Sequence, residues 1–152
     1  MKQKRTFKQL QLIFYALLAG QVMIGAMLWF QMKGQTGGGS ADTGMFGLLV
    51  PAIVLGGVGA SFLLQKYSLS SAASLHTTEE KWGHFQKIWV LRAALQEGAN
   101  LSAIVLALMT GQTRLMLWFP IGVAAFILLR PSLFAFGNDY DVAESGLEEI
   151  AS

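Results

Sequence analysis

Apolar residues in this chain run in long stretches and do not alternate with polar ones. Four stretches approach or exceed the length needed to cross about 30 Å of hydrocarbon as helices. They predict helices at about 10–30, 45–65, 78–110 and 114–130. Because the alternation typical of membrane strands is missing, the pattern predicts an all-α, polytopic membrane protein with a four-transmembrane-helix bundle within 1–135.

The third predicted helix starts before its apolar stretch. Thr77 is followed three residues later by Glu80, which is the spacing of a capping box. A helix over 78–110 is longer than the bilayer is thick, so we expect its first turns to lie in water or along the headgroups. After Pro131 the chain turns acidic, and 136–152 is predicted to be a solvated, partly ordered cytoplasmic tail.

Composition supports the same class. The chain is 53% hydrophobic and 13% charged, with a mean hydropathy of +0.48, which excludes an ordinary soluble domain and makes the lipid bilayer a partner. The absence of cysteine excludes disulfides, thiol catalysis and cysteine metal sites. The net charge of +2 reflects membrane orientation, so no nucleic-acid partner is expected.

The basic residues predict that orientation. One side of the membrane would hold eight of them, Lys2, Lys4, Arg5, Lys8, Lys66, Lys81, Lys87 and Arg130, and the other side only Lys33 and Arg114. The positive-inside rule therefore predicts that both termini are cytoplasmic. The first apolar run is too long for the core of a signal peptide, and it is interpreted as a retained helix.

Small residues repeat at a spacing of four in the first two helices, a pattern that permits close helix approach. The residues of this pattern are Ala16 and Gly20 in the first helix, Ala52, Gly56 and Ala60 in the second, and the further pair Gly57 and Ser61. Packing within the bundle is the principal interpretation, and a seam between copies of the chain is the alternative.

The two halves resemble each other in three places. The sequence A-L-L-A-G at 16–20 compares with A-L-Q-E-G at 94–98, and G-Q-T occurs at 34–36 and again at 111–113. Pro51 and Pro120 lie in the second and fourth helices, where each permits a kink. Two parallel helical-hairpin repeats would explain this pattern, and so would chance matches between apolar sequences.

The third helix carries the candidate site. Glu97 lies near the middle of the apolar stretch 88–109, where a carboxylate costs about 2.5–3.5 kcal/mol on insertion scales. At 100° per residue, the polar side chains of this helix share one arc of about 140°. They are Arg92, Gln96, Glu97 and Asn100, and Gln21 in the first helix is their expected interhelical partner.

Two functions fit this cluster. In the first, Glu97 and its neighbours form interhelical hydrogen bonds in a non-enzymatic structural or accessory membrane protein, which can be a homo-oligomer or bind another membrane protein. In the second, Glu97 is the proton- or cation-binding carboxylate of a small coupled permease or channel. Arg92 would then be a barrier charge or would extend to lipid phosphates.

Parts of known enzyme sites are missing from the sequence. His76 and His84 are eight residues apart without a histidine or cysteine companion, so no metal site is expected. No serine lies in a nucleophile motif, and the sequence holds no phosphate-binding loop or dinucleotide fingerprint. We therefore expect no enzyme activity and no cofactor.

Two resemblances follow from these motifs. Three motifs carry the first one: A-L-L-A-G-Q at 16–21, R-A-A-L-Q-E-G-A-N-L at 92–101 and T-G at 110–111. In these motifs the chain resembles a family of uncharacterised small bacterial four-helix inner-membrane proteins. That resemblance implies the fold and the inner membrane, and no activity. The block at 94–98 followed by S-A-I-V-L-A-L-M at 102–109 also resembles the carboxylate helix of ATP synthase rotor proteolipids.

Overall fold

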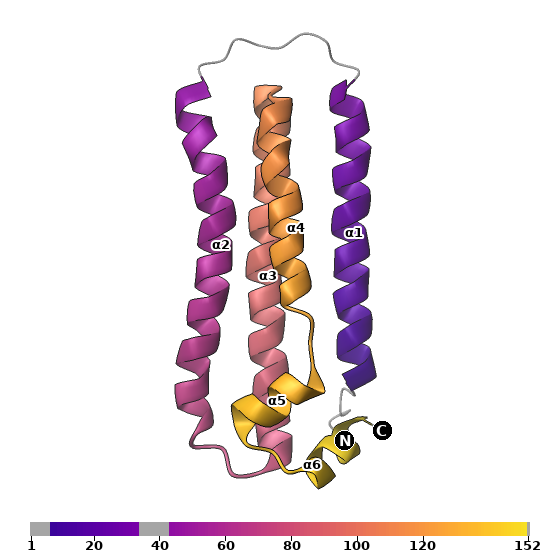
Figure 1. Ribbon diagram of the computed structural model, residues 1–152, viewed down its shortest axis with the longest axis vertical. Coiled ribbons are helices and arrows are strands. Elements are labelled where there is room, and N and C mark those ends of the chain that lie inside the picture. The colour runs from indigo at the N-terminus through magenta and orange to yellow at the C-terminus, as the bar shows by residue number, and fades with distance from the viewer. Residues whose placement is uncertain (1–6, 34–42, 152) are drawn as a thin grey trace.

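The computed structural model describes residues 7–33 and 43–151, and every regular element among them is helical (Figure 1). The elements are α1 (Phe7–Lys33), α2 (Thr43–Ala72), α3 (Thr78–Thr110), the 3-10 helix η1 (Thr113–Leu117), α4 (Trp118–Leu128), α5 (Leu133–Tyr140) and α6 (Glu144–Ala151). The all-helical class expected from the sequence is confirmed for these residues. The basic residues Lys2, Lys4 and Arg5 and most of the 31–43 connection lie outside them.

Three of the helices, α1, α2 and α3, are long and apolar enough to cross a membrane. A fourth crossing requires Thr113–Leu128 and Leu133–Tyr140 to count together as one span, and these two segments are bent by 65° relative to each other. Pro131 lies at this break, where it cannot donate a backbone hydrogen bond and disfavours helical geometry in Arg130. The fourth predicted helix is therefore shorter and more broken than its apolar run suggests.

The bounds of the other helices depend on local signals. α3 has the bounds expected from the sequence, because Thr77 and Glu80 form a reciprocal capping box at its start. Its end is closed by Gly111, which adopts a left-handed φ of 65° that glycine reaches without strain. α2 continues to Ala72, beyond its apolar run, and contains Pro51. Pro120 lies at the start of α4, beside the change from 3-10 to α geometry.

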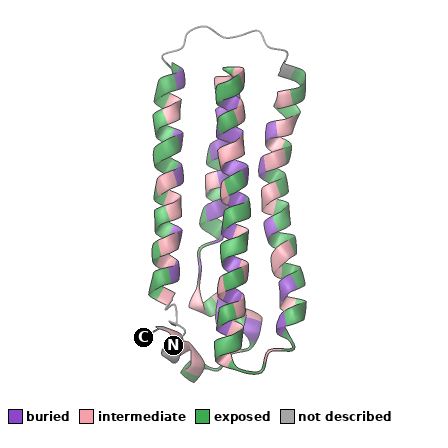
Figure 2. Ribbon diagram, turned by 180° about the vertical axis from the view of Figure 1, so that it is seen from behind, coloured by how far each residue is buried: buried purple, intermediate pink, exposed green. Residues whose placement is uncertain are grey.

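α3 is the central helix of the molecule. It packs against α1, α2 and α4, while α1 and α2 stand on opposite sides of the α3 and α4 pair (Figure 1). Buried positions follow α3 along its length, and exposed positions cover the outward faces of α1 and α2 (Figure 2). An apolar outer surface of this kind is typical of helices in lipid.

The acidic tail is more ordered than the sequence indicates. α5 lies across the end of the bundle at which α1 begins, and its Phe136 and Tyr140 are buried there (Figure 1). They join an aromatic cluster in which the Phe136 ring centroid lies 5.1 Å from that of Trp82 and 5.2 Å from that of Phe85. The expectation of a simply solvated tail is wrong for this segment, because aromatic burial outweighs the nearby negative charges.

Candidate functional site

The polar side chains of α3 do not form one site. Gln96 and Asn100 are almost completely buried, with 1% and 0% of their surface exposed. Asn100 Nδ2 donates to Gln21 Oε1 on α1 at 2.9 Å, which is the interhelical contact expected for Gln21. Gln96 Nε2 donates to Asn100 Oδ1 and to the Gly122 carbonyl of α4, both at 3.3 Å. This cluster therefore connects α1, α3 and α4 in the buried interior of the bundle.

The backbone of α4 makes room for this polar cluster. A Cβ atom at Gly122 would overlap the Asn100 side chain, so only glycine allows α4 to approach α3 this closely. Gln21 Nε2 is the one buried side-chain nitrogen or oxygen without a hydrogen-bond partner among the described residues. The side-chain amides of Gln21, Gln96 and Asn100 thus hold three helices in register, and only the Gln21 Nε2 donor has no partner among the described residues.

Arg92 points away from this cluster, toward α2. Its Nε donates to Ser61 Oγ at 3.2 Å, and it makes no other hydrogen bond with a described residue. The guanidinium borders a small cavity near the α5 end of the bundle. Although the helical arc places Arg92 beside Gln96, the two side chains diverge because α2 and α4 approach α3 from different directions.

Glu97 lies at the surface of the bundle. Its side chain is partly exposed, and it forms no hydrogen bond or ion pair with any described residue. It borders neither the space between α1 and α4, nor the hollow at the start of α4, nor the cavity beside Arg92. The carboxylate near the middle of the apolar stretch 88–109 therefore faces the surroundings of the bundle, separate from Gln96 and Asn100.

The small-residue row predicted to pack within the bundle lies on the outside. Ala16, Ala52 and Ala60 are exposed, and no heavy atom stands within 4 Å of a Cβ built on Gly20 or Gly56. The interpretation of this row as packing within the chain is wrong. Small residues occur on several faces of such apolar helices, so their spacing alone does not identify the packed face.

The close approaches occur at other glycines. On α2, a Cβ at Gly57 would lie 2.6 Å from Ala99 Cβ of α3, and Ser61 one turn further is buried. On α1, a Cβ at Gly25 would overlap the Phe119 ring of α4. The second small pair in α2, Gly57 and Ser61, is thus the packed one.

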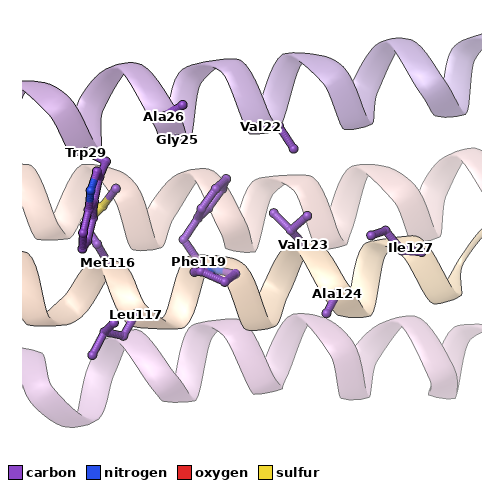
Figure 3. A pocket seen from close by; sticks show the side chains of 11 residues that line it. Val22, Gly25, Ala26, Trp29, Met116, Leu117, Phe119, Val123, Ala124 and Ile127 are labelled. Carbon is purple, nitrogen blue, oxygen red and sulfur yellow. The ribbon is translucent and has the colours of Figure 1, made fainter.

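An apolar groove runs between α1 and α4. Its volume is about 480 Å³, and its walls include Val22, Gly25, Trp29, Phe119 and Val123 (Figure 3). A second hollow of about 530 Å³ lies near the start of α4 and is bordered by Gly47, Arg114 and Trp118. Neither offers several convergent polar groups, so neither has the walls of a catalytic pocket.

The histidines have no metal-site geometry. His84 Nδ1 lies 2.8 Å from the Tyr140 hydroxyl and connects α3 to α5, while His76 is exposed at the start of α3. Within 7–33 and 43–151, no group of three histidine, cysteine, aspartate or glutamate side chains could hold a metal ion.

Three polar residues at the α5 end were not expected from the sequence. Ser61 accepts from Arg92, Gln65 Nε2 donates to Asp139 Oδ2 at 2.9 Å, and all three lie at or beside the cavity that Arg92 borders. Ser61 was expected only as a small packing residue beside Gly57, and the one signal that links it to Gln65 is their spacing of four residues on one helix face. Asp139 belongs to the acidic tail, whose docking could not be predicted.

Because comparisons with known proteins found no match, the function of this chain has to be inferred from its own residues. No protein-family model, no curated protein and no solved structure matches the chain.

Proposed function

We propose that this chain is a non-enzymatic accessory protein of the bacterial inner membrane that self-associates through the surface of α3 around Glu97. It would cross the membrane four times, with the broken α4–α5 segment as the fourth crossing and both termini in the cytoplasm. The resemblance to small four-helix inner-membrane proteins supports this location, and the excess of basic residues at the α5 end supports the orientation.

The separation of Glu97 from the other polar groups carries the proposal. Gln96 and Asn100 form hydrogen bonds with each other, with Gln21 and with the Gly122 carbonyl inside the bundle. Glu97 has no partner among the described residues. An unpaired carboxylate at this depth costs about 2.5–3.5 kcal/mol on insertion scales. A contact that covers Glu97 would remove much of this cost, so the α3 surface favours association.

The neighbours of Glu97 suit a second copy of the chain. Ala94 and Gly98 are exposed on the same helix, and no heavy atom lies within 4 Å of a Cβ built on Gly98. Small residues at this spacing let two helices approach closely. In a two-fold contact the two Glu97 side chains would meet near the axis, where a protonated carboxyl can donate to the carboxylate of the other copy.

Counting subunits in lipid tests the proposal. The wild-type protein in nanodiscs or dilute liposomes should be dimeric or larger by single-molecule photobleaching. Glu97→Ala should weaken association about 3- to 20-fold, since an interhelical hydrogen bond in lipid contributes about 0.6–1.7 kcal/mol. Glu97→Gln retains a hydrogen-bonding side chain and should associate nearly normally.

Met23→Ala is the matched control, because Met23 is exposed on α1, away from the α3 surface. A wild-type protein that remains monomeric at every protein-to-lipid ratio would contradict the proposal. If Glu97→Ala associates as strongly as the wild type, Glu97 does not contribute to self-association.

A proton- or cation-coupled permease is the second candidate, and the same unpaired carboxylate favours it, because it is free to take up a proton or cation. Carbodiimide labelling of Glu97 in proteoliposomes, with Glu97→Gln as the unlabelled control, separates the two functions. Labelling that titrates with pH and is suppressed by one cation, together with flux lost in Glu97→Gln, would favour the permease. If Glu97 does not react with carbodiimide at any pH and the proteoliposomes show no flux, the result would favour the accessory role.

A further inference from the structure

The cavity at the α5 end has a composition unlike the rest of the bundle. It measures about 140 Å³ and lies where α2, α3, the end of α4 and the start of α5 meet. One water needs about 10–15 Å³ of such space, so the cavity can hold a larger polar group. Its charged walls are Arg92 of α3, Asp139 of α5 and Arg130, which is exposed and whose guanidinium lies 6.0 Å from the centre of the Tyr15 ring of α1.

Arg92 and Asp139 attract each other across the cavity but do not form a direct ion pair. Arg92 and Asp139 form no ion pair within 4.0 Å, although both border the cavity. The two Nη groups of Arg92 donate to no described residue, since only its Nε is bonded, to Ser61. Asp139 Oδ1 likewise accepts from no described residue, while Oδ2 is held by Gln65. The Arg92 guanidinium and the Asp139 carboxylate thus border the same cavity, and each can still form hydrogen bonds with a ligand.

The start of α5 adds a further positive element. Ser132 and Ala135 border the cavity, and Ser132 makes no side-chain hydrogen bond to the first turn of α5. The first backbone N–H groups of a helix lack partners within it and attract anions. A phosphate beside Arg92 would lie near this helix end, whereas an ammonium group would be favoured beside Asp139.

The rim of the cavity connects it to the apolar surface of the molecule. Phe62 of α2 and Leu128 of α4 border the cavity and are 55% and 79% exposed. Trp89 Nε1 donates to the Leu129 carbonyl at 2.7 Å, which fixes the end of α4 as one wall. A ligand with apolar chains could keep those chains along Phe62 and Leu128 while its head group entered sideways.

We propose that this cavity binds the head group of a zwitterionic phospholipid with a primary amine, of the phosphoethanolamine type. Its phosphate would contact Arg92 and the start of α5, and its ammonium group would contact Asp139. Arg92 and Arg130 give the walls a net positive charge that attracts the phosphate. The ammonium group of a zwitterionic head group adds a partner for Asp139 that a simple anion lacks. The site is separate from the Glu97 surface and does not depend on self-association.

Native mass spectrometry of the purified full-length protein tests the site by counting bound lipids. Phosphatidylethanolamine, phosphatidylcholine and phosphatidylglycerol with identical acyl chains are titrated separately. We expect phosphatidylethanolamine to bind about tenfold more tightly than either of the others, the effect of one charged hydrogen bond. Phosphatidylcholine cannot donate from its methylated amine to Asp139, and phosphatidylglycerol has no cation.

Two variants examine the two charges. Arg92→Gln should weaken phosphatidylethanolamine binding about tenfold. Asp139→Asn is isosteric and retains an oxygen that can accept from Gln65, and it should shift the preference toward phosphatidylglycerol. Arg114→Gln, at the opposite end of the bundle, is the control and should bind lipid as the wild type does. If Arg92→Gln fails to fold, Asp139→Asn alone decides the question.

Equal binding of the three lipids, or a preference that survives both variants, would overturn the proposal. Displacement of the bound lipid by soluble phosphoethanolamine or by inorganic phosphate at comparable concentration would also overturn it, because the site would then belong to a free phosphate compound. Failure of these competitors, with the expected order of lipids, would support a lipid site.

Discussion

At the residue scale, three glycines determine how closely the helices approach. Gly122 faces Asn100, Gly57 faces Ala99, and Gly25 faces the Phe119 ring. A methyl group at any of them would enter space already filled by a neighbouring helix. The polar cluster around Asn100 therefore depends on a residue of α4 that has no side chain.

Gly122→Ala should lower the stability of the protein. The added Cβ would overlap the Asn100 side chain and displace its bond to Gln21, at an expected cost of about 1–3 kcal/mol. Thermal unfolding in detergent should report a lower Tm. Gly56→Ala is the control, since its Cβ would meet no atom within 4 Å, and it should leave the Tm unchanged or raise it. Equal effects at both positions would contradict this assignment.

At the element scale, α3 is the helix whose start is encoded most clearly. Thr77 Oγ1 accepts from the Glu80 backbone N–H at 3.2 Å, and the Glu80 carboxylate accepts from the Thr77 backbone N–H at 3.2 Å. Hydrogen bonds from the backbone N–H groups of Thr77 and His76 hold the pKa of the Glu80 carboxyl below its usual value. Thr77→Ala should therefore destabilise the start of α3 by about 1 kcal/mol.

The contribution of Glu80 should depend on pH. Because its pKa is lower in the folded protein than in the unfolded chain, its stabilising effect is fully present above the unfolded value and is lost as the pH falls through the folded value. The Tm difference between wild type and Glu80→Gln should thus be largest near neutral pH and shrink in acid. A difference that stays constant or grows in acid would show that the charge of Glu80 does not contribute.

At the scale of the whole molecule, α1 begins at the end of the bundle where α5 and α6 lie (Figure 1). Four crossings would return the chain to its starting side, in agreement with the distribution of basic residues. The broken α4–α5 segment is the part of this arrangement that depends most on the fold, because α4 alone has only 11 residues.

Cysteine accessibility tests the orientation, since the natural chain contains no cysteine. Ser74→Cys and Asn138→Cys place single thiols at exposed positions of the α5 end, and Arg114→Cys places one at the other end. A membrane-impermeant maleimide applied to intact spheroplasts should label only Arg114→Cys, and permeabilised cells should label all three. Labelling of Ser74→Cys or Asn138→Cys in intact spheroplasts would show that the orientation is the opposite of the predicted one.

The candidate site was only partly predictable from the sequence. Helical periodicity placed Arg92, Gln96, Glu97 and Asn100 on one arc and identified Gln21 as a partner, and the structure brings Gln21, Gln96 and Asn100 together. Periodicity could not show that Arg92 turns toward α2 to bond Ser61, or that Glu97 faces outward. Each outcome depends on where the neighbouring helices lie around α3.

The sequence by itself determined the helical class, the apolar spans and the bounds of α3, because hydropathy and capping act within one segment of chain. The tertiary structure decided which small residues are packed, how the tail docks and which polar groups share a cavity. In helices that are apolar on every side, one face differs little from another in sequence. The packed face is therefore chosen by shape complementarity between helices, which no single segment encodes.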